Sequence, residues 1–307
     1  MSDVVVIAHR GASGERPEHT LESYRLAIEE GADYIEPDLV VTGDGVLVAR
    51  HENEIGGTTD VADHPEFAGR RRTQVIEGES LTGWFTEDFT LAELKTLRAR
   101  ERLPDLRPQN RVFDGRFEVP TFDEILQLVT DANRTRQGGP RIGIYPETKH
   151  PAHFAAIGLP EERSVLETLD RFDYGREGSP VFIQSFDPNS LRQLRTMTSL
   201  PLVQLLELEL GDVRDIAEYA DAIGIAKVLA TPHGVAEAHA ADLAVHVWTF
   251  RAENEFLPGD LKIGRSAADH GNLPAEIERY LDLGIDGFFT DFPATGVRVR
   301  DARAKTP

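Results

Sequence analysis

The stretch VVVIAHRGASGE (residues 4–15) begins with a short run of apolar side chains and passes directly into two basic residues and a glycine-containing loop. The run has the length and β-branched composition of a buried strand, and apolar residues at helical spacing follow it between Thr20 and Gly31. The same order of a short apolar run and an amphipathic stretch recurs along the chain. We count about eight such runs, at residues 4–8, 34–41, 141–147, 181–186, 201–206, 222–226, 244–250 and 286–290.

Eight parallel strands that each lead into a helix are typical of a (β/α)8 barrel, a fold that often exceeds about 250 residues as one domain. Helix starts follow several of the runs. Thr121 and Glu124 have the spacing of a capping box, and Asp187 precedes Pro188 as an N-cap precedes a first-turn proline. The sequence therefore predicts an α/β fold in which residues 1–307 form a single TIM-barrel catalytic domain.

The regular pattern is interrupted after the second run. The GDG turn at residues 43–45 predicts that residues 46–49 return as an extra hairpin strand. Residues 52–120 then show turns and scattered aromatics without a clear strand and helix unit. We interpret them as an inserted capping segment between the second strand and its helix. Because barrel enzymes place their active sites at the C-terminal ends of the strands, this insertion is expected to wall the site.

Charge and composition exclude several classes of partner. The 33 basic and 53 acidic residues give a formal net charge of −20 at pH 7. A surface of this sign repels nucleic acids and anionic membrane faces, so an anionic substrate would need a few local cations or a bound metal. The absence of cysteine excludes disulfides and thiolate chemistry.

The sequence also bears on the compartment. No stretch reaches the roughly 18 consecutive apolar residues that a membrane-spanning helix needs. Residues 1–8 are too short for a secretory signal peptide. As numbered, the chain is expected to be cytoplasmic, and it would be periplasmic or secreted if a leader had been removed. Nothing in the sequence predicts the oligomeric state.

Two histidines are candidates for proton transfer. His9 ends the first strand beside Arg10, whose guanidinium can bind a phosphate or carboxylate through two parallel hydrogen bonds. His51 ends the hairpin strand and is therefore expected above the same barrel mouth. Acid–base catalysis of a bond cleavage needs both a proton acceptor and a proton donor, which two histidines can supply. A purely structural pair remains the alternative at this point.

Carboxylates recur at strand ends with a spacing of two. Glu36 and Asp38 point to one face of the second strand, and Glu147 and Lys149 repeat the spacing at the end of the third. Such a pair is often only a solvated strand face. Three carboxylates at neighbouring strand ends instead favour a hard cation such as Mg²⁺ or Ca²⁺, with Lys149 as a second positive charge beside Arg10.

The remaining histidines, among them His19, His150, His153 and His246, are interpreted as unremarkable surface residues. Two aromatic residues are harder to assign. Phe186 follows the fourth strand and Trp248 lies in the seventh, so they either pack in the core or reach the barrel mouth.

Taken together, several of these motifs resemble one known family. HRGASGERPEHT (residues 9–20), EPD (36–38), GDG followed by His51, PETK (146–149) and DGFFTDFP (286–293) are similar to the glycerophosphodiester phosphodiesterases. The resemblance spans both ends of the chain, and it extends to the longer bacterial branch, many of whose members are periplasmic or secreted.

The resemblance implies a TIM barrel with a small insertion after the second strand, and metal-dependent hydrolysis of glycerophosphodiesters to glycerol 3-phosphate and an alcohol through a cyclic glycerol phosphate. It implies the following roles for residues: general acid and base for His9 and His51; ligands of Ca²⁺ or Mg²⁺ for Glu36, Asp38 and Glu147; phosphate-binding cations for Arg10 and Lys149; and a wall on the glycerol side for Phe186 and Trp248. The expected partner is thus a small-molecule glycerophosphodiester, with no nucleic acid and no integral membrane segment.

Three other functions stay open on the sequence alone. One is a related barrel phosphodiesterase that acts on whole phospholipids, although the chain lacks a basic amphipathic stretch for binding a lipid surface. Another is a noncatalytic phosphodiester-binding protein, which loss of His9 or His51 would have favoured. The third is a metal-dependent barrel lyase, which gathers carboxylates at strand ends but has no need of the His9 and Arg10 pair.

Overall fold

The apolar runs of the sequence form the strands of a barrel. The computed structural model describes residues 4–136 and 138–304. Within them, each of the eight predicted runs contains one strand or two short strands. These are β1 (Val5–His9), β2 (Tyr34–Glu36) with β3 (Asp38–Val41), β7 (Gly143–Ile144) with β8 (Glu147–Thr148), β9 (Ile183–Ser185), β10 (Leu202–Leu206), β11 (Ala222–Ala226), β12 (Ala244–Phe250) and β13 (Gly287–Thr290).

Parallel pairing closes these strands into a ring. β1 pairs with both β2 and β13, and β8 to β13 pair in sequence order. The second and third runs are each divided at a proline, Pro37 and Pro146, which has no N–H to donate to the ladder. Their halves still pair side by side, β2 with β7 and β3 with β8. The predicted TIM-barrel class is therefore confirmed.

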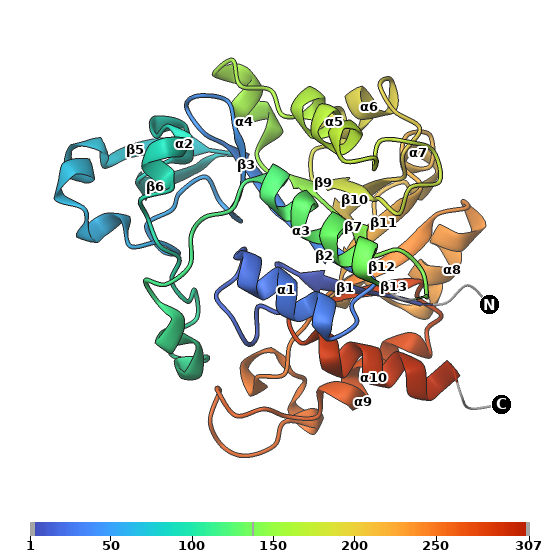
Figure 1. Ribbon diagram of the computed structural model, residues 1–307. Coiled ribbons are helices and arrows are strands. Elements are labelled where there is room, and N and C mark those ends of the chain that lie inside the picture. Colours follow the sequence, from blue (N-terminus) through green and yellow to red (C-terminus); the bar gives the residue numbers. More distant parts are fainter. Residues whose placement is uncertain (1–3, 137, 305–307) are drawn as a thin grey trace.

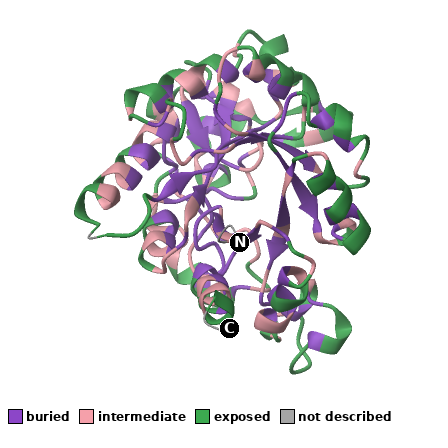
Figure 2. Ribbon diagram, turned by 90° about the vertical axis from the view of Figure 1, so that its right-hand side faces the viewer, coloured by how far each residue is buried: buried purple, intermediate pink, exposed green. Residues whose placement is uncertain are grey.

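Helices cover the outside of the ring, and each barrel run is followed by at least one of them. They are α1 (Leu21–Glu29), α3 (Phe122–Thr135), α4 (Pro151–Ala156), α5 (Glu162–Arg171), α6 (Pro188–Arg195), α7 (Val213–Ile216), α8 (Pro232–Ala240), α9 (Leu273–Leu281) and α10 (Pro293–Ala304). Figure 2 shows the buried strands at the centre and the exposed outer faces of the helices around them. The predicted caps are confirmed at Thr121 and Asp187, and Thr20 caps α1 in the same way, since each of these side chains accepts a backbone N–H of the first turn.

The predicted hairpin is also confirmed. Strand β4 (Leu47–Ala49) runs antiparallel to β3, and Gly45 takes a positive φ of 84° in the turn between them. Between β4 and α3 the chain forms the two-stranded sheet of β5 (Arg72–Ile76) and β6 (Glu79–Gly83), the short helix α2 (Leu91–Leu94) and several 3-10 turns. Figure 1 shows this segment at the end of the molecule away from both chain termini.

Because the N-terminal end of β1 lies near the chain termini, the segment stands at the C-terminal ends of the strands, where barrel active sites are found. In the described ranges, no helix is long and apolar enough to cross a membrane.

The capping box of α3 gives a test of the fold alone. Thr121 accepts the N–H of Glu124, and the Glu124 carboxylate accepts the N–H of Thr121. Replacing Thr121 by Ala should therefore lower the free energy of unfolding by about 1 kcal/mol. At the other end of the same helix, Thr135→Ala serves as a control and should change stability by less than about 0.5 kcal/mol. Thermal melting of the two variants measures both effects, and equal melting temperatures would contradict the capping role.

Candidate active site

The residues singled out in the sequence gather in one pocket at the C-terminal ends of the barrel strands. The pocket has a volume of about 860 Å³. The hairpin of β5 and β6 contributes Ile76, Glu77, Glu79 and Leu81 to its wall. Its lining also includes all of the predicted site residues, namely His9, Arg10, Glu36, Asp38, His51, Glu147, Lys149, Phe186 and Trp248.

Three buried carboxylates form the centre of the pocket. Glu36 ends β2, Asp38 begins β3, and the parallel pairing of β3 with β8 places Asp38 directly beside Glu147. Each residue is at most 4% exposed, and ligand oxygens of the three lie within 4.8 Å of one another. Buried carboxylate oxygens at this separation fit a hard divalent cation, so the three residues could hold Ca²⁺ or Mg²⁺.

The mutual repulsion of these groups changes their proton affinities. Burial, together with the negative charges of Asp38 and Glu147, raises the pKa of Glu36 well above its usual range. Burial also raises the pKa of Glu147 to about 8. Burial acts on Asp38 in the same direction, but Lys149 and His19 hold the pKa of Asp38 well below its usual range. In the metal-free protein, Glu36 and Glu147 therefore hold a proton more tightly than ordinary carboxyl groups do.

Two cations stand beside the carboxylates. Lys149 Nζ lies 2.7 Å from Glu147 Oε1 and 3.5 Å from Asp38 Oδ1. Arg10 follows β1 with a positive φ of 59°, which turns its backbone N–H toward Glu36 Oε2 at 2.7 Å, and its Nε lies 3.3 Å from Asp38 Oδ2. Burial would lower the pKa of Lys149, but Asp38 and Glu147 raise it above the usual value. Both residues can therefore present positive charge to an anion in the pocket.

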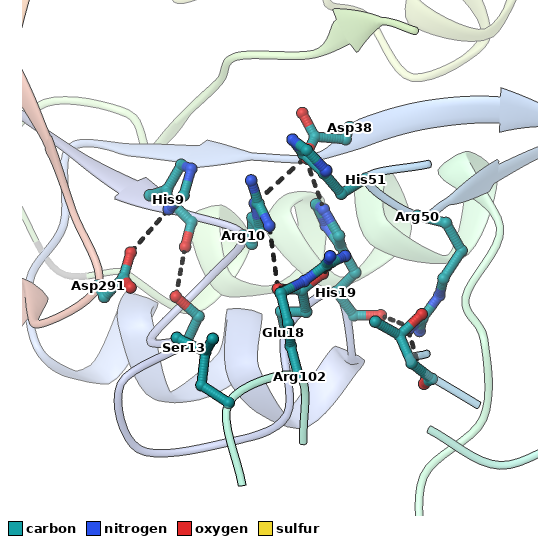
Figure 3. Close-up of polar contacts among 12 residues, drawn as sticks. His9, Arg10, Ser13, Glu18, His19, Asp38, Arg50, His51, Arg102 and Asp291 are labelled. Atoms are coloured by element: carbon teal, nitrogen blue, oxygen red, sulfur yellow. Dashed lines mark hydrogen bonds and ion pairs between the residues drawn. The ribbon is translucent and has the colours of Figure 1, made fainter. Parts of the chain in front are cut away.

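His9 is held by a carboxylate at its Nδ1 atom. Its Nδ1 lies 2.7 Å from Asp291 Oδ1, directly after β13 (Figure 3). The same Asp291 accepts Arg107 Nη2 at 2.5 Å and Arg251 Nε at 3.0 Å. Burial and the positive charge of Arg10 lower the pKa of His9 to about 4. The imidazole is thus neutral at pH 7 and fixed in orientation from one side.

His51 is held in a similar way. Its Nδ1 makes a short contact with Glu52 Oε1, and Glu52 in turn accepts Arg102 Nη1 at 3.0 Å and Nη2 at 2.7 Å. Burial and the positive charges of Arg10 and Lys149 lower the pKa of His51 to about 3. Both histidines therefore have Nδ1 bound to a carboxylate, which leaves Nε2 as the ring nitrogen for exchange with a ligand.

The interpretation of the other histidines as surface residues is wrong for two of them. His19 is fully buried, and its ring connects Asp38 Oδ2, 2.9 Å from Nε2, to the hydroxyl of Tyr24, 2.7 Å from Nδ1. His246 is 2% exposed and bonds the hydroxyl of Tyr145 at 2.8 Å. His19 thus orients a candidate metal ligand, a role that its place in the motif at residues 9–20 could have suggested.

Other residues around the site went unnoticed in the sequence. Gln184 lies in the middle of β9 and donates a hydrogen bond of 3.0 Å to Glu36 Oε1. Nothing in the local sequence pattern distinguishes it from other strand residues. Asp291 lies within the quoted DGFFTDFP motif, which was a usable signal. Arg102 and Arg107 had no such signal because their partners are remote in sequence, up to 184 residues away.

Phe186 and Trp248 lie together on the pocket wall. Their ring centroids are 6.0 Å apart in an edge-to-face arrangement, and Lys149 Nζ lies 5.8 Å from the centre of the Phe186 ring. Phe186 is 44% exposed, whereas Trp248 is half-buried and donates its Nε1–H to Gly224 O at 3.0 Å. The alternative of full core packing is therefore wrong for both rings.

The barrel mouth combines buried oxygen ligands, two cations and two oriented histidines. These groups are typical of hydrolases that act on phosphate esters. Comparison with known proteins defines the group more closely. Residues 9–295 match the Glycerophosphoryl diester phosphodiesterase family, and the chain belongs to this family.

Relatives and solved structures agree with this assignment. A glycerophosphodiester phosphodiesterase of Arabidopsis thaliana is 38% identical over 98% of this chain and 87% of its own length. A glycerophosphodiester phosphodiesterase of Haemophilus influenzae is 29% identical over 96% of this chain and 89% of its own. A crystal structure of a glycerophosphoryl diester phosphodiesterase from Silicibacter pomeroyi matches with a TM-score of 0.74 and 25% identity, covering 99% of this chain and 95% of the other.

The fold is also shared by an Oleispira antarctica phosphodiesterase whose structure contains the product sn-glycerol-3-phosphate. That structure matches with a TM-score of 0.69 and 20% identity over 97% of this chain and 96% of the other. The predicted membership of the family is thus confirmed, and the protein is an enzyme of the phosphodiesterase class.

The raised pKa values of the carboxylates make cation binding pH-dependent. Because a cation needs the ionised carboxylates, it competes with protons for Glu36 and Glu147. Through Glu147, the affinity for Ca²⁺ or Mg²⁺ should therefore rise between about pH 6 and pH 8, by roughly tenfold per pH unit, and this contribution should level off above the Glu147 pKa of about 8. Titration calorimetry in two buffers with different ionisation heats counts those protons.

The stability of the metal-free protein should change in the opposite sense. Because the pKa of Glu147 is higher in the folded protein than its unfolded value of 4.5, the protonated side chain contributes to the free energy of unfolding. That contribution is complete below pH 4.5 and is lost as the pH rises through about 8.

For the calorimetric measurement of cation binding, Glu147→Gln is the matched control, since this variant should release fewer protons when the cation binds. Cation binding without proton release at pH 7 would contradict this account.

Proposed function

We propose that the protein hydrolyses glycerophosphodiesters, such as glycerophosphocholine or glycerophosphoethanolamine, to glycerol 3-phosphate and an alcohol. Catalysis would use His9 and His51 together with a divalent cation. The observation that carries this proposal is one pocket in which both histidines face the same carboxylate cluster and the same two cations. The product bound in the Oleispira relative, sn-glycerol-3-phosphate, is consistent with it.

The two histidines would divide the proton transfers. In the first step the glycerol 2-hydroxyl attacks phosphorus, one histidine, as the neutral imidazole, accepts its proton at Nε2, and the other, which would be protonated once the anionic substrate is bound, donates a proton to the departing alcohol oxygen. A cyclic glycerol phosphate results. Water then opens the ring with the two roles reversed, so each histidine returns to its starting state. Asp291 and Glu52 support these transfers because each would stabilise the imidazolium that forms beside it.

The cations would bind and orient the anionic substrate. Arg10 and Lys149 supply positive charge next to phosphoryl oxygens, where charge grows in the transition state. Glu36, Asp38 and Glu147 would hold Ca²⁺ or Mg²⁺ between them. When bound, such a cation supplies Lewis-acid polarisation of a phosphoryl oxygen.

Metal dependence is the most direct test of the proposal. A chelator should abolish release of glycerol 3-phosphate, and added Ca²⁺ or Mg²⁺ should restore it. The cation should also raise the melting temperature, because it binds only the folded state. The control is the same chelator saturated with Ca²⁺ before addition, which should leave activity intact. Full activity after thorough chelation would show that the carboxylates serve another purpose.

Removal of either histidine should affect turnover more than binding. His9→Ala and His51→Ala should each lower kcat by roughly 10²-fold or more, the usual contribution of a positioned general acid or base. Affinity for glycerol phosphate should change much less, since the cations remain. His233, whose side chain is 91% exposed, offers a matched control, and His233→Ala should keep wild-type kcat. Near wild-type turnover in His51→Ala would remove that residue from the mechanism.

We further propose that Phe186 and Trp248 form the wall against which the glycerol backbone packs. Their rings meet edge to face on the pocket surface, and their apolar faces suit a three-carbon chain. Trp248→Ala should then raise the KM for glycerophosphodiesters while leaving bis(p-nitrophenyl) phosphate comparatively unaffected. Trp84→Ala is the control, because Trp84 also donates its Nε1–H to a backbone carbonyl but lies outside the pocket lining. Equal losses on both substrates, with a lower melting temperature, would assign Trp248 a packing role only.

The alternatives raised by the sequence are less well supported. A noncatalytic binding protein would not need two histidines that are each oriented by a carboxylate. The relatives that match over nearly the full chain carry the name glycerophosphodiester phosphodiesterase rather than that of an enzyme acting on whole phospholipids or of a lyase. Released glycerol 3-phosphate, measured against several head groups, separates these functions.

A further inference from the structure

Arg102, in the chain segment between β4 and α3, lies between two carboxylates of the active-site surroundings. Its Nε and Nη2 donate to Glu18 at 2.8 and 2.7 Å, and its Nη1 and Nη2 donate to Glu52 at 3.0 and 2.7 Å. Glu18 is 84 residues away in sequence and Glu52 is 50 residues away. One guanidinium therefore joins the loop after β1 to the end of the β3–β4 hairpin.

Each of these carboxylates contacts a residue of the proposed machinery. Glu52 holds Nδ1 of His51 through its Oε1 atom. Glu18 accepts Arg10 Nη1 at 3.0 Å, and Figure 3 shows Glu18 between Arg10 and Arg102. Arg102 is thus connected to His51 through Glu52 and to Arg10 through Glu18.

We propose that Arg102 is a positioning residue for both groups at once. The inference rests on the proposed function, because it assigns Arg102 the task of preparing His51 and Arg10 for a phosphodiester. On the His51 side, two hydrogen bonds fix Glu52, which in turn fixes the orientation of the imidazole. On the Arg10 side, Arg102 shares the negative charge of Glu18, so that the Arg10 guanidinium keeps positive charge for the substrate.

The geometry requires a guanidinium. Arg102 makes paired hydrogen bonds to two carboxylates along two edges of one planar group, which matches the fork of an arginine. A lysine carries a single ammonium and cannot make both paired contacts. Without any cation, Glu18 would pair more strongly with Arg10 and would repel the substrate phosphate. Glu52 would lose the two bonds that hold it beside His51.

Two separate kinetic effects follow from the contacts of Arg102 with Glu52 and with Glu18. Measured with glycerophosphocholine and saturating Ca²⁺, Arg102→Ala should lower kcat by roughly 10-fold or more through His51 and raise KM several-fold through Arg10. Arg102→Lys should restore part of both losses. The control is Arg70→Ala in the same segment. Arg70 pairs with Glu93 through its Nη1 at 2.9 Å and has a side-chain exposure of 33% against 27% for Arg102, but its partner Glu93, unlike Glu52, lies outside the pocket lining. Its kcat and KM should match the wild type.

Double variants separate positioning from loss of folding. After Glu52→Gln, adding Arg102→Ala should lower kcat little further, because the contact from Arg102 to His51 through Glu52 is already weakened. After Glu18→Gln, adding Arg102→Ala should raise KM little further, because the contact to Arg10 through Glu18 is already weakened. Additive effects in both cycles would overturn the proposal. So would an Arg102→Ala enzyme whose kcat and KM both stay within twofold of the wild type, or one whose kcat falls only in proportion to the folded fraction with KM unchanged.

The wild type distinguishes this inference from the function on which it rests. If the wild-type protein releases no glycerol 3-phosphate from glycerophosphocholine or glycerophosphoethanolamine, the proposed function fails. If the wild type is active and Arg102→Ala is equally active, the function stands and the role of Arg102 falls.

Discussion

The repulsion among three buried carboxylates governs the organisation of this active site. Parallel strand register forces Glu36, Asp38 and Glu147 to the same edge of the barrel, where each is nearly excluded from water. Such a cluster is costly to bury unless protons, cations or hydrogen-bond donors offset the charge. The backbone N–H of Arg10, the ring of His19, the amide of Gln184 and the ammonium of Lys149 all converge on it for this reason, as would a bound metal.

A second set of charges surrounds the first. Asp291 and Glu52 each hold a histidine at Nδ1, and Arg107 and Arg102 each hold one of those carboxylates. Positive and negative groups therefore alternate outward from the carboxylate centre, so few charges are buried without a partner of opposite sign. The alternation explains how a chain of net charge −20 can present local positive charge to an anionic substrate.

The sequence predicted the parts of this arrangement that depend on local pattern. Strand periodicity and the caps at Thr121 and Asp187 located the barrel, and the spacing of two between carboxylates located the edge at which the three carboxylates gather. The buried state of His19 was missed because burial depends on helix α1 and β3 folding over it. The roles of Arg102 and Arg107 were missed because an ion pair between residues 50 to 184 positions apart leaves no local signal.

The division of work between the barrel and the segment 52–120 follows from the same contrast. The barrel strands can fix residues at their own ends, because register determines which side chains are neighbours. They position His9, which ends β1, and they bring Asp291, directly after β13, against its Nδ1. The segment 52–120 adds the outer contacts, since Arg102 and Arg107, five residues apart in sequence, bind Glu52 and Asp291, the carboxylates that hold the two histidines. A change in this segment can therefore alter catalysis without touching a barrel strand.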